Sequence, residues 1–296
     1  MQNIPSDSPF SLDTDIAYQN WREQKIAAHP KSIADIVVSV ADPFHVTVDE
    51  TNELRDRIRR CNMAIYSIQH LPDDPADKSI LYEMGKHFGL QHLDQNLYAD
   101  EDAISSLAIT EHKGSKGYIP YTNKPIAWHT DGYYNTGEKQ IRAMLLHCVR
   151  PAKSGGSNQL LDHEMAYLLL RDRNPAYIEA LMRYDAMSIP ANTREGQEIR
   201  PAVTGPVFSL DPQYKLHMRY TARTRSIEWL NDPLVLAARE ALQDILKNPG
   251  PYHFEGTLQA GQGLLCNNTL HTRSRFEENS DRLLYRARYF DRIAET

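Results

Sequence analysis

Three side chains that together suit one metal ion lie in two widely separated parts of this chain. His129 and Asp131 are divided by a single threonine, whereas His271 lies close to the C-terminal end. Two imidazoles and one carboxylate are the ligand set of non-haem Fe(II) sites that keep coordination positions open for chemistry. If all three bind one ion, the fold must bring the middle of the chain against its end. This requirement constrains the fold more than any other feature of the sequence.

A histidine and an aspartate two positions apart occur easily by chance, and the chain contains a second such pair, His92 and Asp94. Strand geometry separates the two pairs, because residues i and i+2 of a strand face the same side about 7 Å apart. Apolar and aromatic residues precede His129, as is typical of a strand that enters a core. His92 instead follows a predicted helix and precedes polar residues. We therefore expect the first pair to bind metal and the second to lie in a surface turn.

The last predicted strand carries arginines at alternate positions. Counting in steps of two from Arg282 places Arg286 and Arg288 on one face of residues 283–290. If this face lines the interior, each guanidinium needs an anion, because an unpaired buried charge is costly. If the face is exposed, these are ordinary surface residues. Periodicity leaves both alternatives open, and only the first supports His271 as a metal ligand rather than a solvent-exposed residue.

Length alone does not decide between one large domain and two small ones, but no linker long enough to divide the chain stands out. We expect residues 1–296 to form a single domain, with residues 1–45 as a peripheral segment. A net charge of −6 argues against a nucleic-acid binder. No apolar run approaches the ~20 residues of a membrane span, and no secretory signal pattern is present. The 3 cysteines suggest neither disulfides nor a zinc site, which favours a reducing cytoplasm. The sequence leaves open whether the protein forms a homo-oligomer.

The predicted elements are mainly strands with helices inserted between them. The clearest helix covers residues 233–247, where Asp232 can cap the N-terminus, Pro233 suits the first turn, and an apolar stripe runs from Leu234 to Ile245. We expect helices at 48–60, 76–88, 163–171, 176–183 and 233–247, strands at 64–68, 126–129, 141–149, 203–210, 215–220, 263–267 and 283–290, and a flexible tip at 113–117. This mixture favours a sandwich or jelly roll over a parallel α/β sheet.

Taken together, these motifs resemble the taurine/2,4-dichlorophenoxyacetate dioxygenase-like family of Fe(II)/2-oxoglutarate-dependent oxygenases. The similarity rests on WHTDG at residues 128–132, a Gly-Gly turn at residues 154–158, Asn-Asn-Thr-Leu before His271, and the arginines at 282 and 286. It extends from about residue 45 to residue 292. The resemblance implies a mainly β fold with helical insertions, built on a double-stranded β-helix (jelly roll). It also implies a requirement for Fe(II), 2-oxoglutarate and O2.

By the same resemblance, three residues hold the iron and two contact the cosubstrate. His129, Asp131 and His271 match the metal ligands. Arg282 matches the arginine that pairs with the distal carboxylate of 2-oxoglutarate. Asn158 stands where the family usually has threonine or serine against that carboxylate, so it keeps a donor but departs from the pattern. Related halogenating enzymes have a small residue in place of the aspartate, so Asp131 implies hydroxylation or another oxygenase outcome.

A few cationic and aromatic side chains indicate the class of substrate. Arg286 matches a position that meets the substrate anion in sulfonate-oxidising members and helps to anchor the cosubstrate in others. Because residues 215–225 are dense in cations, Arg219 and Arg223 either line an anion pocket or belong to a solvated loop. Tyr133 either lines the site or packs in the core. We expect a small, carboxylate-bearing metabolite such as an amino acid.

Two other classes of function remain open from the sequence. One is hydroxylation of a protein side chain, but the chain contains no recognisable recognition module. The other is a non-catalytic jelly-roll protein that holds a structural metal. A structural metal site would have no need of the arginine at position 282, which argues against this second class.

Overall fold

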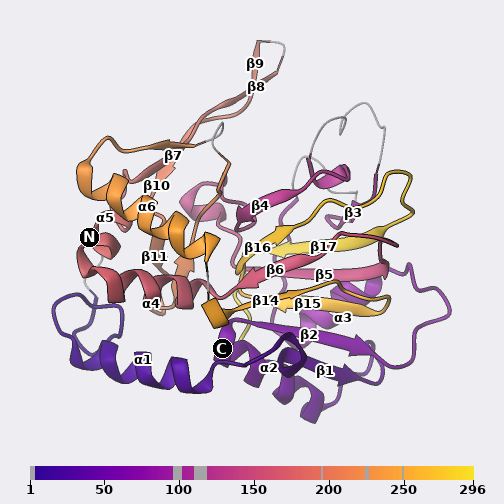
Figure 1. The fold of residues 1–296 in the computed structure, drawn as a ribbon. Helices are drawn as coiled ribbons and strands as arrows, with labels where there is room; N and C mark the ends of the chain where they lie inside the picture. The colour runs from indigo at the N-terminus through magenta and orange to yellow at the C-terminus, as the bar shows by residue number, and fades with distance from the viewer. Residues whose placement is uncertain (1–3, 96–101, 110–118, 195, 224–226, 249) are drawn as a thin grey trace.

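Two β-sheets form the centre of the protein in the computed structural model (Figure 1). The structure describes residues 4–95, 102–109, 119–194, 196–223, 227–248 and 250–296. The larger sheet contains, in spatial order, β1 (Val37–Val40), β2 (Met63–Ile68), β15 (Gln262–Cys266), β5 (Ala143–Arg150), β17 (Leu283–Tyr289) and β3 (Ser105–Leu107). The smaller sheet contains β14 (His253–Gly256), β6 (Asn158–Leu161), β16 (Leu270–Arg273) and β4 (Ile126–His129). Strands from the middle and the end of the chain therefore alternate in both sheets.

The two sheets pack face to face through one shared apolar cluster. Leu146 and Leu264 of the larger sheet belong to the same buried cluster as Leu160 and Phe254 of the smaller sheet. Cross-strand partners in a sheet point to the same side. The row Ile65, Leu264, Leu146 and Arg286 therefore faces this interior as a set.

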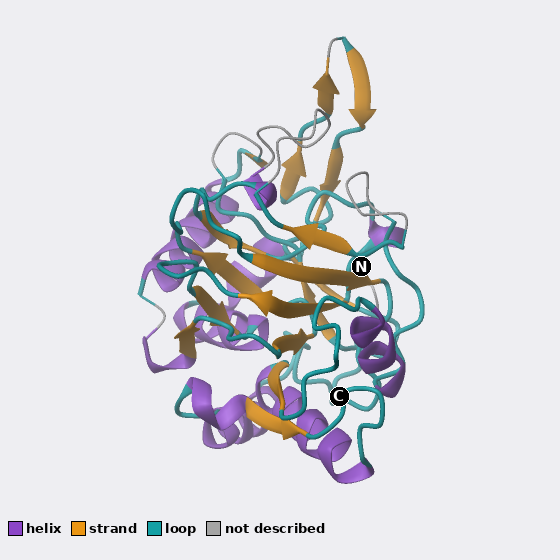
Figure 2. Cartoon of the chain, turned by 90° about the vertical axis from the view of Figure 1, so that its right-hand side faces the viewer, coloured by secondary structure: helices purple, strands orange, loops and turns teal. Residues whose placement is uncertain are grey.

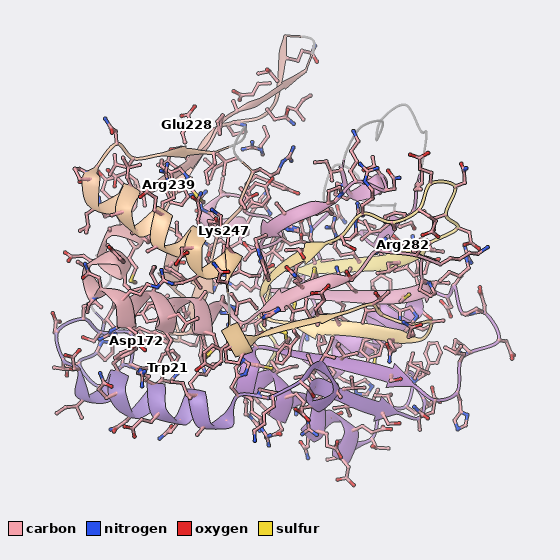
Figure 3. All side chains as sticks on the ribbon, in the orientation of Figure 1. Trp21, Asp172, Glu228, Arg239, Lys247 and Arg282 are labelled. Atoms are coloured by element: carbon pink, nitrogen blue, oxygen red, sulfur yellow. The ribbon has the colours of Figure 1, made fainter. Side chains whose placement is uncertain are left out.

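In the described part of the chain, six α-helices lie outside these sheets. Residues of α2 and α3 pack with Tyr66, Leu145 and Tyr285 on the outer face of the larger sheet. The other four helices gather at one side of the sheets, where Figure 3 shows Trp21 of α1 and Asp172 of α4 near each other. The helices are α1 (Ile16–Ala28), α2 (Val48–Cys61), α3 (Ser79–His87), α4 (His163–Arg173), α5 (Pro175–Leu181) and α6 (Pro233–Lys247).

Shorter elements complete the fold around the site. Figures 1 and 2 both show the hairpin β8–β9 projecting away from the body of the molecule. The small strands are β7 (Met187–Ile189), β8 (Asn192–Arg194), β9 (Gln197–Arg200), β10 (Val203–Gly205), β11 (Phe208–Leu210), β12 (Leu216–Met218) and β13 (Glu228–Trp229). The 3-10 helices are η1 (Ile33–Ile36), η2 (Ile119–Tyr121), η3 (Gly137–Lys139) and η5 (Gly250–Tyr252).

Local sequence signals predicted most of the long elements correctly. The helix predicted at 233–247 is α6, and the Asp232 carboxylate accepts hydrogen bonds from two backbone amides of its first turn. Thr47 and Glu50 form the expected capping box of α2. The strand-rich architecture with inserted helices agrees with the predicted fold class. Among the described residues, none of the helices combines the length and apolar character needed to cross a membrane.

Several predictions of shorter elements were incomplete or wrong. The strand predicted at 203–210 is two strands, β10 and β11, which belong to different sheets. Leu234 is more than a third exposed, so it does not belong to the buried stripe of α6. The strands β6 and β16 were not predicted, and β16 carries His271, which is buried rather than solvent-exposed. The tip predicted at 113–117 lies outside the described residues.

The N-terminal segment takes part in the core more than its polar sequence suggests. Strand β1 pairs in parallel with β2 at the edge of the larger sheet. Tyr18 and Lys25 of α1 are buried. The Lys25 ammonium lies 2.7 Å from a carboxylate oxygen of Asp162, the N-cap residue of α4. This buried ion pair joins the N-terminal helix to the helical layer beside the sheets.

Candidate active site

Antiparallel pairing of β4 and β16 brings the predicted metal ligands together. His129 and His271 are cross-strand partners, and their ring centroids are 4.2 Å apart. Strand β4 ends at His129, so Asp131 lies in the turn beyond it, with its Oδ1 atom 3.6 Å from His129 Nε2. One ligand atom from each of the three residues lies within 4.8 Å of the other two. The predicted triad is thus a spatial cluster.

Glycine allows the chain to turn immediately after this cluster. Gly132 has a φ of +64°, a left-handed conformation that side chains disfavour. A Cβ atom at this position would also lie 2.3 Å from the Ile141 side chain. Both the backbone conformation and the close packing therefore require glycine at this turn.

Backbone carbonyls orient both imidazole rings. The Nδ1 atom of His129 lies 2.9 Å from the Ala127 carbonyl oxygen, and that of His271 lies 3.0 Å from the Thr269 carbonyl oxygen. Only a protonated Nδ1 can donate to a carbonyl, so these contacts place the hydrogen on Nδ1 and leave Nε2 with its lone pair. This is the arrangement that metal-binding histidines use.

The remaining polar atoms of the cluster suit a divalent cation. Asp131 Oδ2 is buried and accepts no aligned hydrogen bond from the described residues, which leaves its coordination incomplete. Burial acts to raise the pKa of Asp131, but the Arg286 guanidinium and the neighbouring His129 hold that pKa well below its ordinary value. Burial, together with His129, lowers the pKa of His271 to about 4. An ionised carboxylate and a neutral imidazole are the forms that bind a metal ion.

Arg286 projects from β17 into the space between the sheets and contacts the cluster. Its Nη1 atom lies 3.2 Å from Asp131 Oδ2. The register of β17 against β5 places Arg286 opposite Leu146, whose side chain belongs to the inter-sheet core. Of the two alternatives for the arginine face, the interior one is therefore correct.

Arg282 directly precedes the same strand (Figure 3), and its guanidinium is buried. Within the described part of the chain, this guanidinium forms neither an ion pair nor a hydrogen bond. Its Cζ atom lies over the Phe276 ring, 5.0 Å from the ring centroid. A Cβ atom on Gly156 would lie 3.5 Å from Arg282 Nε, so the Gly-Gly turn borders this guanidinium. Burial lowers the pKa of Arg282. A buried guanidinium of this kind is a receptor for a carboxylate.

The Gly-Gly turn and Asn158 follow one another at the start of β6. Gly155 and Gly156 have φ values of +77° and +73°, which confirms a turn that depends on glycine. A Cβ atom on Gly155 would lie 2.2 Å from the Arg275 carbonyl oxygen. The Asn158 amide nitrogen donates to the Thr272 carbonyl at 2.7 Å. The role of Asn158 towards the cosubstrate stays a prediction, with one amide hydrogen still available.

Two of the predicted substrate residues, Arg223 and Tyr133, directly follow segments that contact or carry the metal ligands. Thr221 forms an isolated bridge with His129, so Arg223 follows two residues after a direct neighbour of a ligand. Arg223 is exposed. Tyr133 directly follows the Gly132 turn, and its ring contacts that of Tyr134 with centroids 5.2 Å apart. The contact of either residue with a substrate stays a prediction.

The structure argues against the prediction that Arg219 binds substrate. Its guanidinium is buried and directs all five N–H donors at main-chain carbonyls. The acceptors are the carbonyl oxygens of Tyr133, Met187, Val203, Gly205 and Pro206. No donor is left for an anion, so Arg219 holds the backbone around β7 and β10 together.

The second histidine–aspartate pair has a structural role. His92 is exposed, and its Nδ1 atom lies 2.7 Å from a carboxylate oxygen of Asp291. Asp94 is buried and forms an ion pair with Arg288. This burial corrects the prediction of a surface turn for Asp94. Arg288 also donates to the Tyr134 hydroxyl at 2.9 Å, so the pair supports the loop that follows the metal ligands.

Sequence reasoning missed two residues that hold the site in place. Arg273 lies two positions after His271 and donates to the carbonyls of Ile119, Pro120, Thr122 and Lys124. It therefore fixes the segment that leads into β4. Asn268 bonds the backbone of Asp131. The spacing from His271 was a usable signal for Arg273, whereas the Asn-Asn-Thr-Leu motif before His271 contained Asn268 without indicating its contact with Asp131.

Comparisons with known proteins agree with this geometry. The sequence model of the family described as "Taurine catabolism dioxygenase TauD, TfdA family" matches residues 30–288. A uridine-5'-phosphate dioxygenase of a Streptomyces species is 30% identical over 194 residues, which cover 63% of this chain and 68% of that protein. A trimethyllysine dioxygenase of Meyerozyma guilliermondii is 30% identical over 254 residues, or 79% of this chain and 58% of that protein.

Solved structures share the fold at low sequence identity. One is the non-haem iron oxygenase OrfP in complex with Fe, succinate and (3S)-hydroxy-L-arginine. Its TM-score is 0.58 with 15% sequence identity, and the alignment covers 82% of this chain and 80% of that chain. At this identity the likeness concerns the fold alone.

Proposed function

The chain belongs to the TauD/TfdA family of Fe(II)/2-oxoglutarate-dependent dioxygenases, and we propose that it oxidises a small, carboxylate-bearing metabolite such as an amino acid. The observation that carries the proposal is the position of Arg286. This cation lies between the two sheets, and its Nη1 atom is 3.2 Å from Oδ2 of Asp131 in the metal cluster. A substrate that approaches the cluster therefore meets a positive charge directly beside it.

We assign the metal to His129, Asp131 and His271. Their free Nε2 atoms and the incompletely bonded Asp131 Oδ2 support this assignment. Three protein ligands leave positions for a cosubstrate and O2. When bound, the iron supplies the chemistry by which 2-oxoglutarate and O2 become succinate and CO2 while a substrate C–H bond is oxidised. The protein contributes ligand orientation and a buried setting.

We assign the distal carboxylate of 2-oxoglutarate to Arg282. This guanidinium is buried and lacks an anionic partner among the described residues, so a carboxylate would satisfy it. The neighbouring Gly-Gly turn borders it, because a Cβ atom on Gly156 would lie in van der Waals contact with Arg282 Nε, at 3.5 Å. Asn158 is placed two residues later and can offer its second amide hydrogen to the same carboxylate.

The substrate class follows from charge and from which cations lie at the metal cluster. Arg219 is fully engaged by the main chain and Arg288 by Asp94, which leaves Arg286 as the cation that reaches the cluster. Arg223, which is exposed beyond Thr221, can contact a second polar group of the substrate. Relatives are named for uridine-5'-phosphate and for trimethyllysine, which are both small anionic or carboxylate-bearing molecules.

The proposal also includes the topology of the core and the number of domains. The two sheets that face each other around the cluster support a double-stranded β-helix as the core of a single domain covering residues 1–296. All three cysteines are free and buried, which supports a reducing, cytoplasmic setting.

Anaerobic titration of the protein with Fe(II) and 2-oxoglutarate tests the class of cofactor. We expect a weak visible charge-transfer band that requires both additions. Succinate release under air is then compared between amino acids and their methyl esters, which lack the carboxylate charge. We expect turnover with at least one free acid and much less with its ester. A band without any preference for the acids would contradict the substrate class, and the lack of a band would contradict the cofactor assignment.

A further inference from the structure

The side chain of Asn268 bridges the two parts of the chain that carry the metal ligands. Its Oδ1 atom accepts a hydrogen bond from the Asp131 N–H at 2.8 Å, and its Nδ2 atom donates to the Asp131 carbonyl at 2.9 Å. The same Nδ2 donates to the Ile141 carbonyl at 2.6 Å. One buried amide therefore satisfies both main-chain groups of a metal ligand, in the manner of a strand partner.

The backbone at Asn268 adopts a conformation that favours this contact. Its φ is +51°, in the left-handed region, where asparagine is tolerated better than most residues. Three residues later the chain reaches His271 in β16. The backbone of Asp131 is thereby fixed relative to the strand that carries the third ligand, across a sequence separation of 137 residues.

We propose that Asn268 is a positioning residue of the metal site, which fixes Asp131 against the two histidines and raises the affinity for the metal ion. This inference rests on the proposed function, since it assumes that the three residues bind a metal. Asn268 itself does not touch the ion. Outer residues that orient metal ligands typically change metal affinity by roughly 10–100-fold when they are replaced.

The adjacent residue, Asn267, provides a matched control. It is the same residue type and equally buried, and its amide also makes three hydrogen bonds. These bonds reach Asn62, Thr296 and Ile293 instead of the metal cluster. Replacing Asn267 therefore removes a buried amide of the same kind without loosening Asp131.

The experiment compares Asn268→Gly, Asn268→Ala and Asn267→Gly in the full-length protein. Binding of Mn(II) to the metal-free protein is measured by electron paramagnetic resonance, and stability by thermal unfolding. Glycine accepts a positive φ, whereas alanine does not, so the first two variants lack the amide but differ in backbone strain. We expect both to bind Mn(II) roughly 10–100-fold more weakly than the wild type, with the alanine variant less stable. Asn267→Gly should lose stability but keep Mn(II) affinity within about twofold.

Each of the other outcomes would contradict a different part of the reasoning. Wild-type affinity in Asn268→Gly would show that Asn268 only shapes the turn, which overturns the inference while leaving the metal site intact. An equal loss of affinity in Asn267→Gly would attribute the effect to general destabilisation and also overturn it. If the wild type binds no Mn(II), the metal site itself is wrong, and the proposed function fails together with the inference.

Discussion

Replacing Arg286 with methionine should make the metal-free protein less stable and its metal affinity higher. The guanidinium lies 3.2 Å from Asp131 Oδ2, and the two side chains are only 12% and 4% exposed. At this distance and an effective dielectric constant of about 20, the Coulomb attraction is about 5 kcal/mol. Part of it offsets desolvation, and loss of one partner from a buried pair costs about 3–5 kcal/mol. We expect a decrease of about 3 kcal/mol in the free energy of unfolding.

Binding of a divalent cation should restore most of the free energy of unfolding that Arg286→Met loses. The metal ion and the guanidinium compete for the same carboxylate, so removing Arg286 leaves Asp131 available to the ion. Binding adds RT ln(1 + [L]/Kd) to the free energy of unfolding. If the ion recovers about 1.4 kcal/mol more in the variant than in the wild type, its affinity is about tenfold higher. Urea unfolding at pH 7 with and without Mn(II), together with calorimetric titration of Mn(II), measures both quantities.

Arg288→Met is the matched control for this prediction. Arg288 lies on the same face of β17 but forms its ion pair with Asp94, which is not a metal ligand. We expect this variant to lose comparable stability that Mn(II) does not recover preferentially. If the stability difference between Arg286→Met and the wild type is the same with and without Mn(II), the competition between guanidinium and metal is refuted. Weaker Mn(II) binding to the variant would refute it as well.

Three further predictions concern other buried cations. Arg282→Leu should raise the KM for 2-oxoglutarate by at least tenfold and leave the Kd of Mn(II) nearly unchanged; an unchanged KM for 2-oxoglutarate would remove Arg282 from the cosubstrate site. Arg219→Met should lower the free energy of unfolding by at least about 3 kcal/mol without changing the KM for substrate in the folded protein, because five buried carbonyls lose their donor. Lys25→Met should cost about 3–5 kcal/mol at pH 7. Although burial acts to raise the pKa of Asp162, Lys25 holds it below its ordinary value. This stabilisation is present above the unfolded pKa of about 3.9 and is lost as the pH falls through the folded pKa, so the difference between Lys25→Met and wild type in urea unfolding should shrink on acidification below about pH 4.

The elements that the sequence predicted well are those whose signals are local. Helix α6 has its cap, its first-turn proline and its apolar stripe within one segment, so no distant contact is needed to recognise it. The arginine face of β17 was visible from a period of two, although only the pairing with β5 shows that it points inward. Strand β16 was missed because it has four residues of mixed polarity and is a strand only through its pairing with β6 and β4.

The same distinction separates the residues of the site that were found from those that were not. A metal ion accepts few kinds of side chain, so His129, Asp131 and His271 could be recognised by residue type and spacing. Arg219 and Asn268 bind main-chain groups, which every residue possesses, so their partners leave no mark in the sequence. A cationic segment therefore suggested a substrate contact at Arg219, whereas its five acceptors come from backbone that is distant in sequence. Because a metal ion selects few types of side chain, its ligands can be recognised from the sequence. The residues that position those ligands can be recognised only once the fold brings their side chains against the main-chain carbonyls and amides that they bind.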